Sequence, residues 1–144
     1  MRQIALGLAL SLLAAPALAA DPVEGDWLVE TRRVMVKMAP CPAAPAKLCG
    51  KIVWMKAPLD DAGKPKRDIL NPDVARHDDP VMGMLMVRDF SNAGPGKWKG
   101  GKIYDPNSGR TYDSKMQVQS DGTLKLDGCV LKLVCVAQTW TRPA

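Results

Sequence analysis

Few side chains in this sequence could do chemistry, and three methionines are the most suggestive of them. Met82, Met84 and Met86 alternate along the segment VMGMLMVRDF. Alternate residues of a β-strand share one face, so three thioethers would lie side by side. Thioethers suit Cu(I), but methionine also fills irregular cores and lines adaptable apolar pockets. Of these two interpretations, a Cu(I) site and an apolar wall, we expect the apolar wall, with no metal and no cofactor.

The four cysteines are the second group with chemical potential. They are Cys41, Cys49, Cys129 and Cys135. Within each neighbouring pair the spacing is wider than in ordinary zinc sites, and disulfides are the usual state of cysteines in an exported protein. We expect the pairs Cys41–Cys49 and Cys129–Cys135, because each pair can bracket one loop. Each bridge would stabilise the fold by roughly 2–3 kcal/mol through loop entropy.

Catalytic residue patterns are poorly represented, and we expect no enzyme. The single histidine, His77, lies in a charged segment, and Ser114 lies in an alternating strand pattern with no candidate base beside it. No G-x-S-x-G elbow occurs. The acidic pairs 60–61 and 78–79 lack the alternating ligand spacing of a calcium loop. We interpret these acids as solvated loop residues.

The first residues predict export. Arg2 precedes an apolar run over 4–13, and Ala17-Leu18-Ala19 is a small-x-small cleavage signal. This pattern is typical of a secretory signal peptide, and the run is too short to cross a bilayer. We therefore expect a signal peptide at 1–19, cut after Ala19, and one mature domain at 20–144 that is periplasmic or secreted. No later segment is apolar enough for a membrane span.

Charge does not indicate a nucleic-acid partner. The formal net charge is +5, and lysine and arginine are scattered apart from clusters at 64–67 and 97–102. Nucleic-acid binding by an exported chain would call for clustered aromatic residues among the basic ones, which are absent from the sequence. We interpret the basic clusters as a solvated face, with a patch for anionic lipid, glycan or peptidoglycan as the alternative.

The strands are organised around the segment WKGGKIYDPNSGRTY, which reads as strand, turn, strand. Asp105 to Gly109 supply the turn, and Gly109 can adopt the positive φ that the re-entry needs. The whole chain alternates such strands with turns, for example at Asp121-Gly122. Strands are expected at 25–30, 34–38, 48–57, 81–90, 98–104, 111–119, 123–128 and 136–142. Loops are expected at 39–47, 129–135 and 58–80, the last with a short helix at 72–77 capped by Asn71.

Eight short strands joined mostly as hairpins predict an all-β fold, an eight-stranded antiparallel up-and-down barrel with one long loop that carries a short helix. A barrel of eight strands has room inside for side chains or for one small ligand.

Motifs along nearly the whole mature chain resemble those of domain-of-unknown-function family 2147, a group of small exported bacterial proteins. The matching segments are GDWLVE, CGKIVWM, GKPKRDILNPD, PVMGMLMV, WKGGKIYDPNSGRTY, DGTLKLDG and QTWTR. The resemblance implies a lipocalin-like barrel and no agreed activity. In lipocalins a Trp in an early G-x-W lies under a late Arg at the closed end, and Trp27 and Arg142 occupy those positions. The resemblance therefore implies a barrel-closing cation–π contact between them, worth ~1–2 kcal/mol when desolvated.

The function that we predict is non-catalytic binding of a small apolar or amphipathic ligand inside the barrel. The expected pocket residues are Trp54, Met82, Met84, Met86, Trp98, Tyr104, Tyr112 and Met116. One alternative is a filled barrel that acts on an envelope partner through its surface, and another is Cu(I) binding by a methionine cluster. A hollow barrel should show a cavity of a few hundred Å³. A filled barrel should show none, and a copper site should bring at least three sulfurs to one point.

Overall fold

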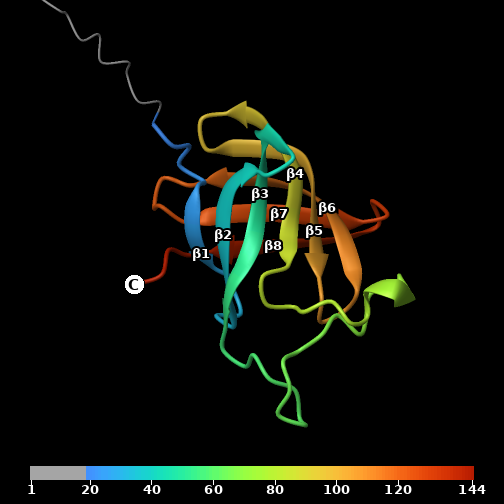
Figure 1. Ribbon diagram of the computed structural model, residues 1–144. Coiled ribbons are helices and arrows are strands. Elements are labelled where there is room, and N and C mark those ends of the chain that lie inside the picture. Colours follow the sequence, from blue (N-terminus) through green and yellow to red (C-terminus); the bar gives the residue numbers. More distant parts are fainter. Residues whose placement is uncertain (1–18) are drawn as a thin grey trace, which may run out of the picture.

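A computed structural model describes residues 19–144, which form one antiparallel sheet of eight strands in sequential order. The predicted signal peptide at 1–19 lies, except for Ala19, outside the described residues. Figure 1 shows that the sheet curls on itself. The strands are β1 (Gly25–Leu28), β2 (Val34–Cys41), β3 (Ala44–Met55), β4 (Leu85–Gly94), β5 (Lys97–Asp105), β6 (Arg110–Val118), β7 (Leu124–Val130) and β8 (Val134–Trp140).

The curled sheet is a half-barrel that is joined at one end only, which corrects the prediction of a fully closed barrel. Its two edges meet where the Leu28 amide donates to the Thr141 carbonyl at 2.7 Å and the Thr141 amide donates back at 3.0 Å. β1 has only four residues, so it cannot pair along the length of β8. No further backbone bridge joins the two edges within residues 19–144.

The contact expected between Trp27 and Arg142 is confirmed at this joint. The Arg142 guanidinium carbon lies 3.8 Å from the centroid of the Trp27 ring. The same guanidinium donates to the carbonyls of Asp26 at 3.1 Å and Pro22 at 2.8 Å. Burial lowers the pKa of Arg142 from its usual value. The group thus ties the start of the described chain to its end.

The core fills the joined end of the half-barrel. Trp27 and Trp140 are fully buried there with Phe90, and the Trp27 indole donates to the Val23 carbonyl at 2.7 Å. A Cβ on Gly101 would lie 2.0 Å from the Phe90 ring, so the ring packs directly on the backbone of β5. Large buried rings therefore occupy this end.

The segment expected to be a loop at 39–47 is instead the end of one strand and the start of the next. β2 continues to Cys41, and β3 begins at Ala44 after a turn at Pro42 and Ala43. A register shift between Pro40 and Cys41 accommodates a residue that has no N–H to donate. The prolines suggested a loop, but strands tolerate proline at such irregularities.

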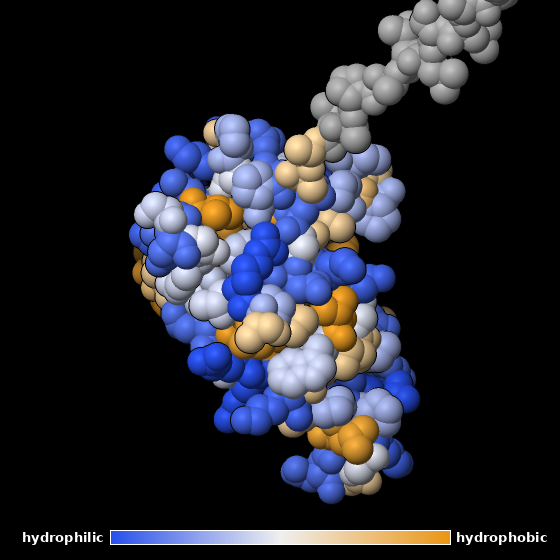
Figure 2. Space-filling view, turned by 90° about the vertical axis from the view of Figure 1, so that its left-hand side faces the viewer, coloured by the Kyte–Doolittle hydropathy of each residue, from blue (hydrophilic) through white to orange (hydrophobic). Residues whose placement is uncertain are grey.

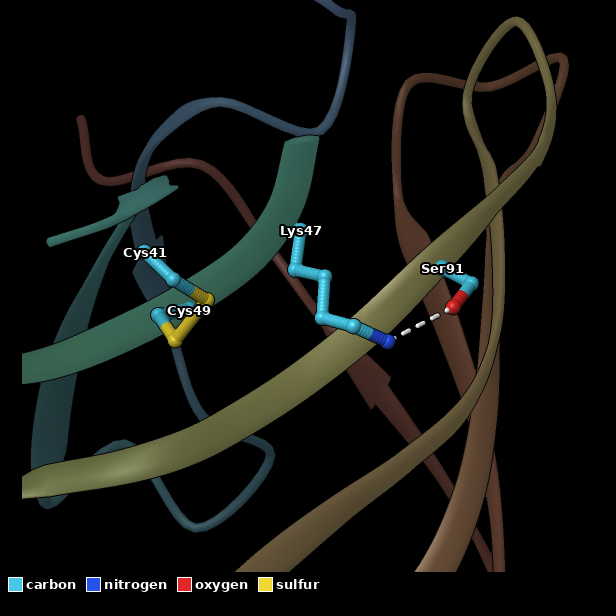
Figure 3. Close-up of a disulfide and its surroundings, with 4 residues drawn as sticks. All are labelled: Cys41, Lys47, Cys49 and Ser91. Atoms are coloured by element: carbon cyan, nitrogen blue, oxygen red, sulfur yellow. Dashed lines mark hydrogen bonds between the residues drawn. A yellow bond between two sulfur atoms is a disulfide. The ribbon is translucent and has the colours of Figure 1, made fainter. Parts of the chain in front are cut away.

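Both predicted disulfide pairings are confirmed. The Cys41–Cys49 bond measures 2.06 Å and the Cys129–Cys135 bond 2.04 Å. Figure 3 shows the disulfide between Cys41 and Cys49. Near it, the Lys47 ammonium donates to the Ser91 hydroxyl at 3.1 Å. Each bridge lies near the turn of one hairpin.

The predicted loop at 129–135 is wrong, because Cys129 and Cys135 are opposite residues of paired strands. The turn is confined to Leu131, Lys132 and Leu133. Leu131 and Lys132 adopt φ angles of 52° and 57°, which are usually adopted by Gly or Asn in hairpin turns. The turn therefore carries no sequence signal.

The fourth strand starts later than predicted, at Leu85 rather than at Val81. Met82 and Gly83 form a turn in which Gly83 has a φ of 83° and donates its amide to the Ile52 carbonyl at 2.9 Å. The alternation of the three methionines therefore does not place them on one strand face.

The long loop between β3 and β4 carries a single 3-10 turn, η1 (Val74–Arg76), and no α-helix is present in residues 19–144. Asp73, rather than the expected Asn71, caps this turn by accepting from the Ala75 amide at 3.0 Å. Asn71 instead accepts from the Asp73 amide at 2.9 Å. Within the described part of the chain, no helix is both long enough and apolar enough to span a membrane.

The hairpin of β5 and β6 agrees with its prediction. Residues 106–109 form the turn, and Gly109 adopts a φ of 71°. Along β6, Ser114 and Met116 are buried, whereas the residues between and beside them are exposed. This period of two is what one buried face of a strand requires.

Candidate functional site

A cavity of about 1280 Å³ occupies the end of the half-barrel opposite the core. Its walls come from the inner faces of most of the strands and combine apolar with polar side chains. The apolar residues that line it are Val29, Val34, Ile52, Met55, Ala57, Ile69, Leu70, Val81, Met86, Ile103, Pro106, Leu126 and Val136. This volume exceeds the few hundred Å³ that distinguish a hollow barrel from a filled one.

Small residues on two strands help to keep this end hollow. Ser114 on β6 and Gly128 on β7 are paired neighbours that line the cavity. A Cβ on Gly128 would lie 2.7 Å from the Ser114 hydroxyl, so no larger residue fits beside it without a shift. The Ser114 hydroxyl donates to the Tyr112 carbonyl at 3.1 Å, so its own hydrogen is satisfied.

Charged side chains surround the mouth of the cavity. The cations in its lining are Arg33, Lys56, Lys66 and Arg67, and the acids are Asp60, Asp61 and Asp105. They come from the turn after β1, from the long loop, and from the end of β5. The site thus combines an apolar interior with a charged rim.

The long loop, residues 56–84, folds over one side of this mouth. Its path is held by two isolated bridges, Leu59 with Pro65 and Arg67 with Pro80. Ile69 and Leu70 line the cavity from this loop, although they remain 66% and 50% exposed. Apolar side chains exposed at a cavity mouth are available to cover a ligand.

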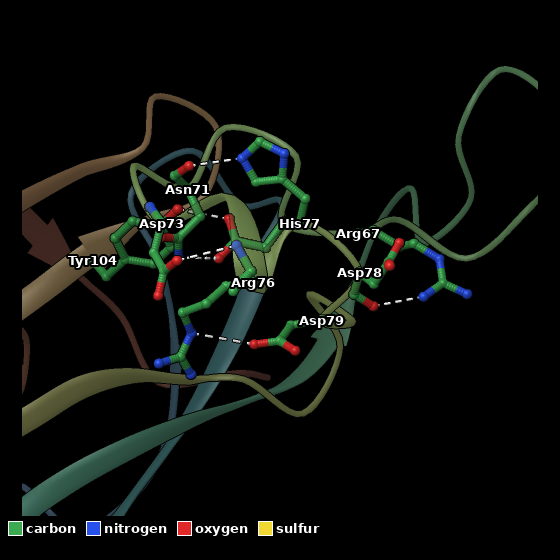
Figure 4. A network of polar contacts seen from close by, with 10 residues as sticks. Arg67, Asn71, Asp73, Arg76, His77, Asp78, Asp79 and Tyr104 are labelled. Atoms are coloured by element: carbon green, nitrogen blue, oxygen red, sulfur yellow. Dashed lines mark hydrogen bonds and ion pairs between the residues drawn. The ribbon is translucent and has the colours of Figure 1, made fainter.

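A buried polar contact anchors the long loop to the wall of the half-barrel. Asp68 is 1% exposed and accepts a hydrogen bond from the Tyr104 hydroxyl at 2.6 Å. The Asn71 amide donates to the other Asp68 oxygen at 2.7 Å. Burial, followed by the hydrogen bond and charge of Asp68, raises the pKa of Tyr104 well above its ordinary value. Figure 4 shows Tyr104 of β5 among the polar residues of the loop.

The loop also packs against the turn between β5 and β6. A Cβ on Gly109 would lie 2.0 Å from the Leu70 carbonyl oxygen, so only glycine permits this approach. Further along the loop, a ring nitrogen of His77 lies 2.8 Å from the Asn71 carbonyl, and Arg76 pairs with Asp79 at 3.2 Å. His77 therefore serves the local structure of the loop.

Of the eight predicted pocket residues, Met86 and Tyr112 line the cavity. Trp98 and Met116 belong to the buried core, and Trp54 is 41% exposed to solvent. The other methionines, Met82 and Met84, lie in and just after the turn that precedes β4, and Met82 is exposed. Tyr104 is buried beneath the long loop through its bond to Asp68.

An irregularity in β5 explains why Tyr104 does not face the cavity. The register shifts between Trp98 and Gly101, which reverses the faces of the residues that follow. As a result Ile103, and not Tyr104, lines the interior. Leu126 also lines the cavity and was not among the predicted pocket residues, although the alternation of Leu124 and Leu126 in β7 could have indicated it.

Metal binding has little support among the described residues. Cys41, Cys49 and Asp89 bring possible ligand atoms within 4.8 Å of one another, but the two sulfurs form a disulfide and are not free thiolates. The methionines are dispersed, since Met38 and Met116 lie in the core, Met55 and Met86 in the cavity wall and Met82 at an exposed turn.

An eight-stranded antiparallel half-barrel with a hollow end defines a small lipocalin-like protein. The chain belongs to DUF2147, a family of uncharacterised proteins conserved in bacteria, whose model matches residues 25–142.

A solved structure has the same fold. It is protein HP1028 from the human pathogen Helicobacter pylori, which is described as belonging to the lipocalin family. The two chains share 21% sequence identity and superpose with a TM-score of 0.70, over 85% of this chain and 83% of the other. No curated protein matches the sequence.

Proposed function

We propose that this protein is an exported, non-catalytic binding protein that holds a small apolar or amphipathic ligand in the half-barrel. The cavity of about 1280 Å³, with apolar side chains from most of the strands in its walls, is the observation that carries the proposal. Burial of apolar ligand surface would drive binding, at roughly 25 cal/mol per Å² before the costs of association. The two disulfides are compatible with an oxidising compartment, which supports a periplasmic or secreted location.

The two alternative functions have less support. A filled barrel that works through its surface requires a packed interior, whereas a cavity is present. On the face seen in Figure 2, hydrophobic patches are small and separated by hydrophilic residues. A Cu(I) site requires converging sulfurs, and the expected methionine row does not lie along one strand.

The first test is native mass spectrometry of the mature protein purified from the exported fraction, with metal analysis of the same sample. We expect a copurified mass that is lost on denaturation. Stoichiometric copper in place of an organic mass would support the methionine alternative.

A matched pair of variants tests the site itself. Leu126→Trp places an indole in the cavity, whereas Val53→Trp adds the same group on β3 at a residue that is 41% exposed. The neutral probe N-phenyl-1-naphthylamine should become fluorescent with the wild type and with Val53→Trp, and much less with Leu126→Trp. Equal fluorescence with Leu126→Trp would overturn the proposed site.

A further inference from the structure

We infer that the ligand of this cavity is an amphipathic anion, with an acyl chain in the half-barrel and a single negatively charged head group at the mouth. This inference rests on the proposed function, because it concerns the same cavity. It deepens that function by naming the chemical class of the ligand and the residues that bind its head group, Arg33, Lys56, Lys66 and Arg67.

Two of these cations are held together at the ends of β2 and β3. Arg33 precedes β2 and Lys56 follows β3, and the Lys56 amide donates to the Arg33 carbonyl at 2.8 Å. Both residues line the mouth. Their side chains therefore start from one fixed point of the rim, and only the long side chains need to be ordered by a ligand.

The other two cations are fixed by the fold of the long loop. The Lys66 amide donates to the Pro58 carbonyl at 3.0 Å, and the Lys66 carbonyl accepts from the Val81 amide at 3.0 Å. The next residue, Arg67, is bridged to Pro80. This segment presents two adjacent cations to the mouth without relying on a charged partner.

None of the four cations is engaged in an ion pair within residues 19–144. The salt bridges found there join Arg76 to Asp79 and Lys102 to Asp113, which are not among the lining residues. The Arg67 guanidinium donates to the Asp78 backbone carbonyl, which is neutral. Arg33, Lys56 and Lys66 thus remain available to an anion, and Arg67 uses one of its N–H groups for the contact with Asp78.

The acids of the rim are directed largely to their own turns. One Asp60 oxygen accepts from the Ala62 and Lys64 amides, both at 2.9 Å. Asp105 accepts from the Asn107 amide at 2.9 Å and from the Ser108 hydroxyl at 2.8 Å. Asp61 is the third acid of the rim. The four cations therefore lie beside three carboxylates, and two of these carboxylates already accept hydrogen bonds from their own turns.

The interior forces the head group to remain at the mouth. An unpaired charge moved into an apolar cavity would lose its hydration without compensation. Ser114 and Gln138 are polar residues of the strands that line the cavity, and the side chains of both already have partners. The Ser114 hydroxyl donates to a backbone carbonyl, and the Gln138 side-chain oxygen accepts from the Trp140 indole at 2.9 Å. The chain of the ligand therefore enters first, and the charge stays beside the cations.

Three ligands that share an aliphatic chain of the same length, but differ in the head group, test whether binding requires a negative charge. Dodecanoate, dodecyl phosphate and dodecanol are titrated by displacement of N-phenyl-1-naphthylamine from the full mature protein. We expect at least one of the two anions to bind about tenfold more tightly than dodecanol, with an affinity that falls as salt increases. Preference for dodecanoate would indicate a free carboxylate ligand, and preference for dodecyl phosphate would indicate a phosphate-headed lipid.

Variants identify the cations. Arg33→Gln with Lys66→Gln should weaken the better anion about tenfold, since each exposed pair contributes about threefold, and should leave dodecanol unchanged. Lys125→Gln, an exposed change on β7 outside the lining, is the matched control. Equal binding of all three ligands, or salt-independent binding of the anions by the wild type, would overturn the charge requirement but leave the proposed function intact. Failure of all three ligands to displace the probe would overturn the inference, and failure of the probe itself to bind would overturn the proposed function as well.

Discussion

At its joined end the half-barrel is filled by large aromatic side chains, whereas at its other end the same strands surround a cavity. The filled end contains Trp27, Trp140 and Phe90, all fully buried. The hollow end has Ser114 and Gly128 on its inner face and is covered partly by a loop. The comparison shows how side-chain volume, rather than strand arrangement, decides which part of a sheet provides stability and which part can accept a ligand.

The two ends also differ in how distant segments are held together. At the filled end a cation lies over an aromatic ring and closes the sheet. At the hollow end a neutral phenol donates to a buried carboxylate and secures the long loop. We therefore expect changes at the filled end to act on global stability, and changes at the hollow end to act first on the loop and on ligand entry.

The largest effect is expected for Trp27→Ala. Loss of a fully buried indole should lower the free energy of unfolding by about 3–5 kcal/mol. Urea denaturation followed by circular dichroism measures this change. Trp54→Ala, which removes a half-exposed indole, is the control and should cost less than about 1 kcal/mol. Similar losses for both variants would contradict the assignment of the core to the joined end.

The two disulfides allow a direct comparison of the two ends, because each end of the half-barrel contains one of them. Their sequence separations are 8 for Cys41–Cys49 and 6 for Cys129–Cys135. Replacing either pair by serine should cost about 2–2.5 kcal/mol from loop entropy. Cys41 and Cys49 are both buried, whereas Cys135 is exposed, so mild reductant should open the second bridge first. Mass spectrometry after alkylation would show which disulfide is reduced first. Reduction of Cys41–Cys49 before Cys129–Cys135 would contradict this prediction.

Tyr104→Phe should cost about 1.5–2 kcal/mol, because the buried Asp68 loses a hydrogen-bond donor. The expected pH dependence follows from the raised pKa of Tyr104. The ordinary pKa of tyrosine is 10.0, so below that pH the phenol is protonated in both the folded and the unfolded state. The contribution of Tyr104 to the free energy of unfolding is therefore fully present below pH 10. As the pH rises beyond 10 the unfolded state loses this proton first, and stability falls.

Thermal unfolding of the wild type and Tyr104→Phe between pH 8 and pH 11 measures this effect, with Tyr112→Phe as the control. The excess loss of stability above pH 10 should vanish in Tyr104→Phe and persist in Tyr112→Phe. Parallel pH curves for the wild type and Tyr104→Phe would show that Tyr104 does not anchor the loop.

The smallest effect on stability is expected for Gly109→Ala. The new Cβ would meet the Leu70 carbonyl, and alanine is strained at a φ of 71°. We expect a global cost of about 1 kcal/mol, and a larger loss of hydrogen-exchange protection in the amides of 66–71 as the loop moves away. Gly122→Ala is the control, because Gly122 has a φ of 82° and open space around it. This variant shows the cost of backbone strain alone, without the contact between the turn and the loop. Unchanged protection of the loop in Gly109→Ala would refute the contact.

The contact between Trp27 and Arg142 was predicted only through the family resemblance. The sequence by itself determined the strand content, the sequential hairpins and both disulfide pairings. These features follow from local signals, since alternation, turn residues and cysteine spacing act over a few neighbouring positions. The hairpin turn at Gly109 was predictable for the same reason. The turn at Leu131 and Lys132 was not, because its positive φ angles are adopted by residues that ordinarily avoid them.

Only the tertiary structure decided which side chains face the cavity. A register shift in β5 turned Tyr104 outward and Ile103 inward, and the late start of β4 removed two methionines from the predicted wall. The burial of Asp68 beneath the long loop likewise depended on a partner 36 residues away in sequence. Such features arise from pairing between strands and from packing between distant segments, so local periodicity can predict that a strand has a buried face but cannot determine where an irregularity exchanges its faces.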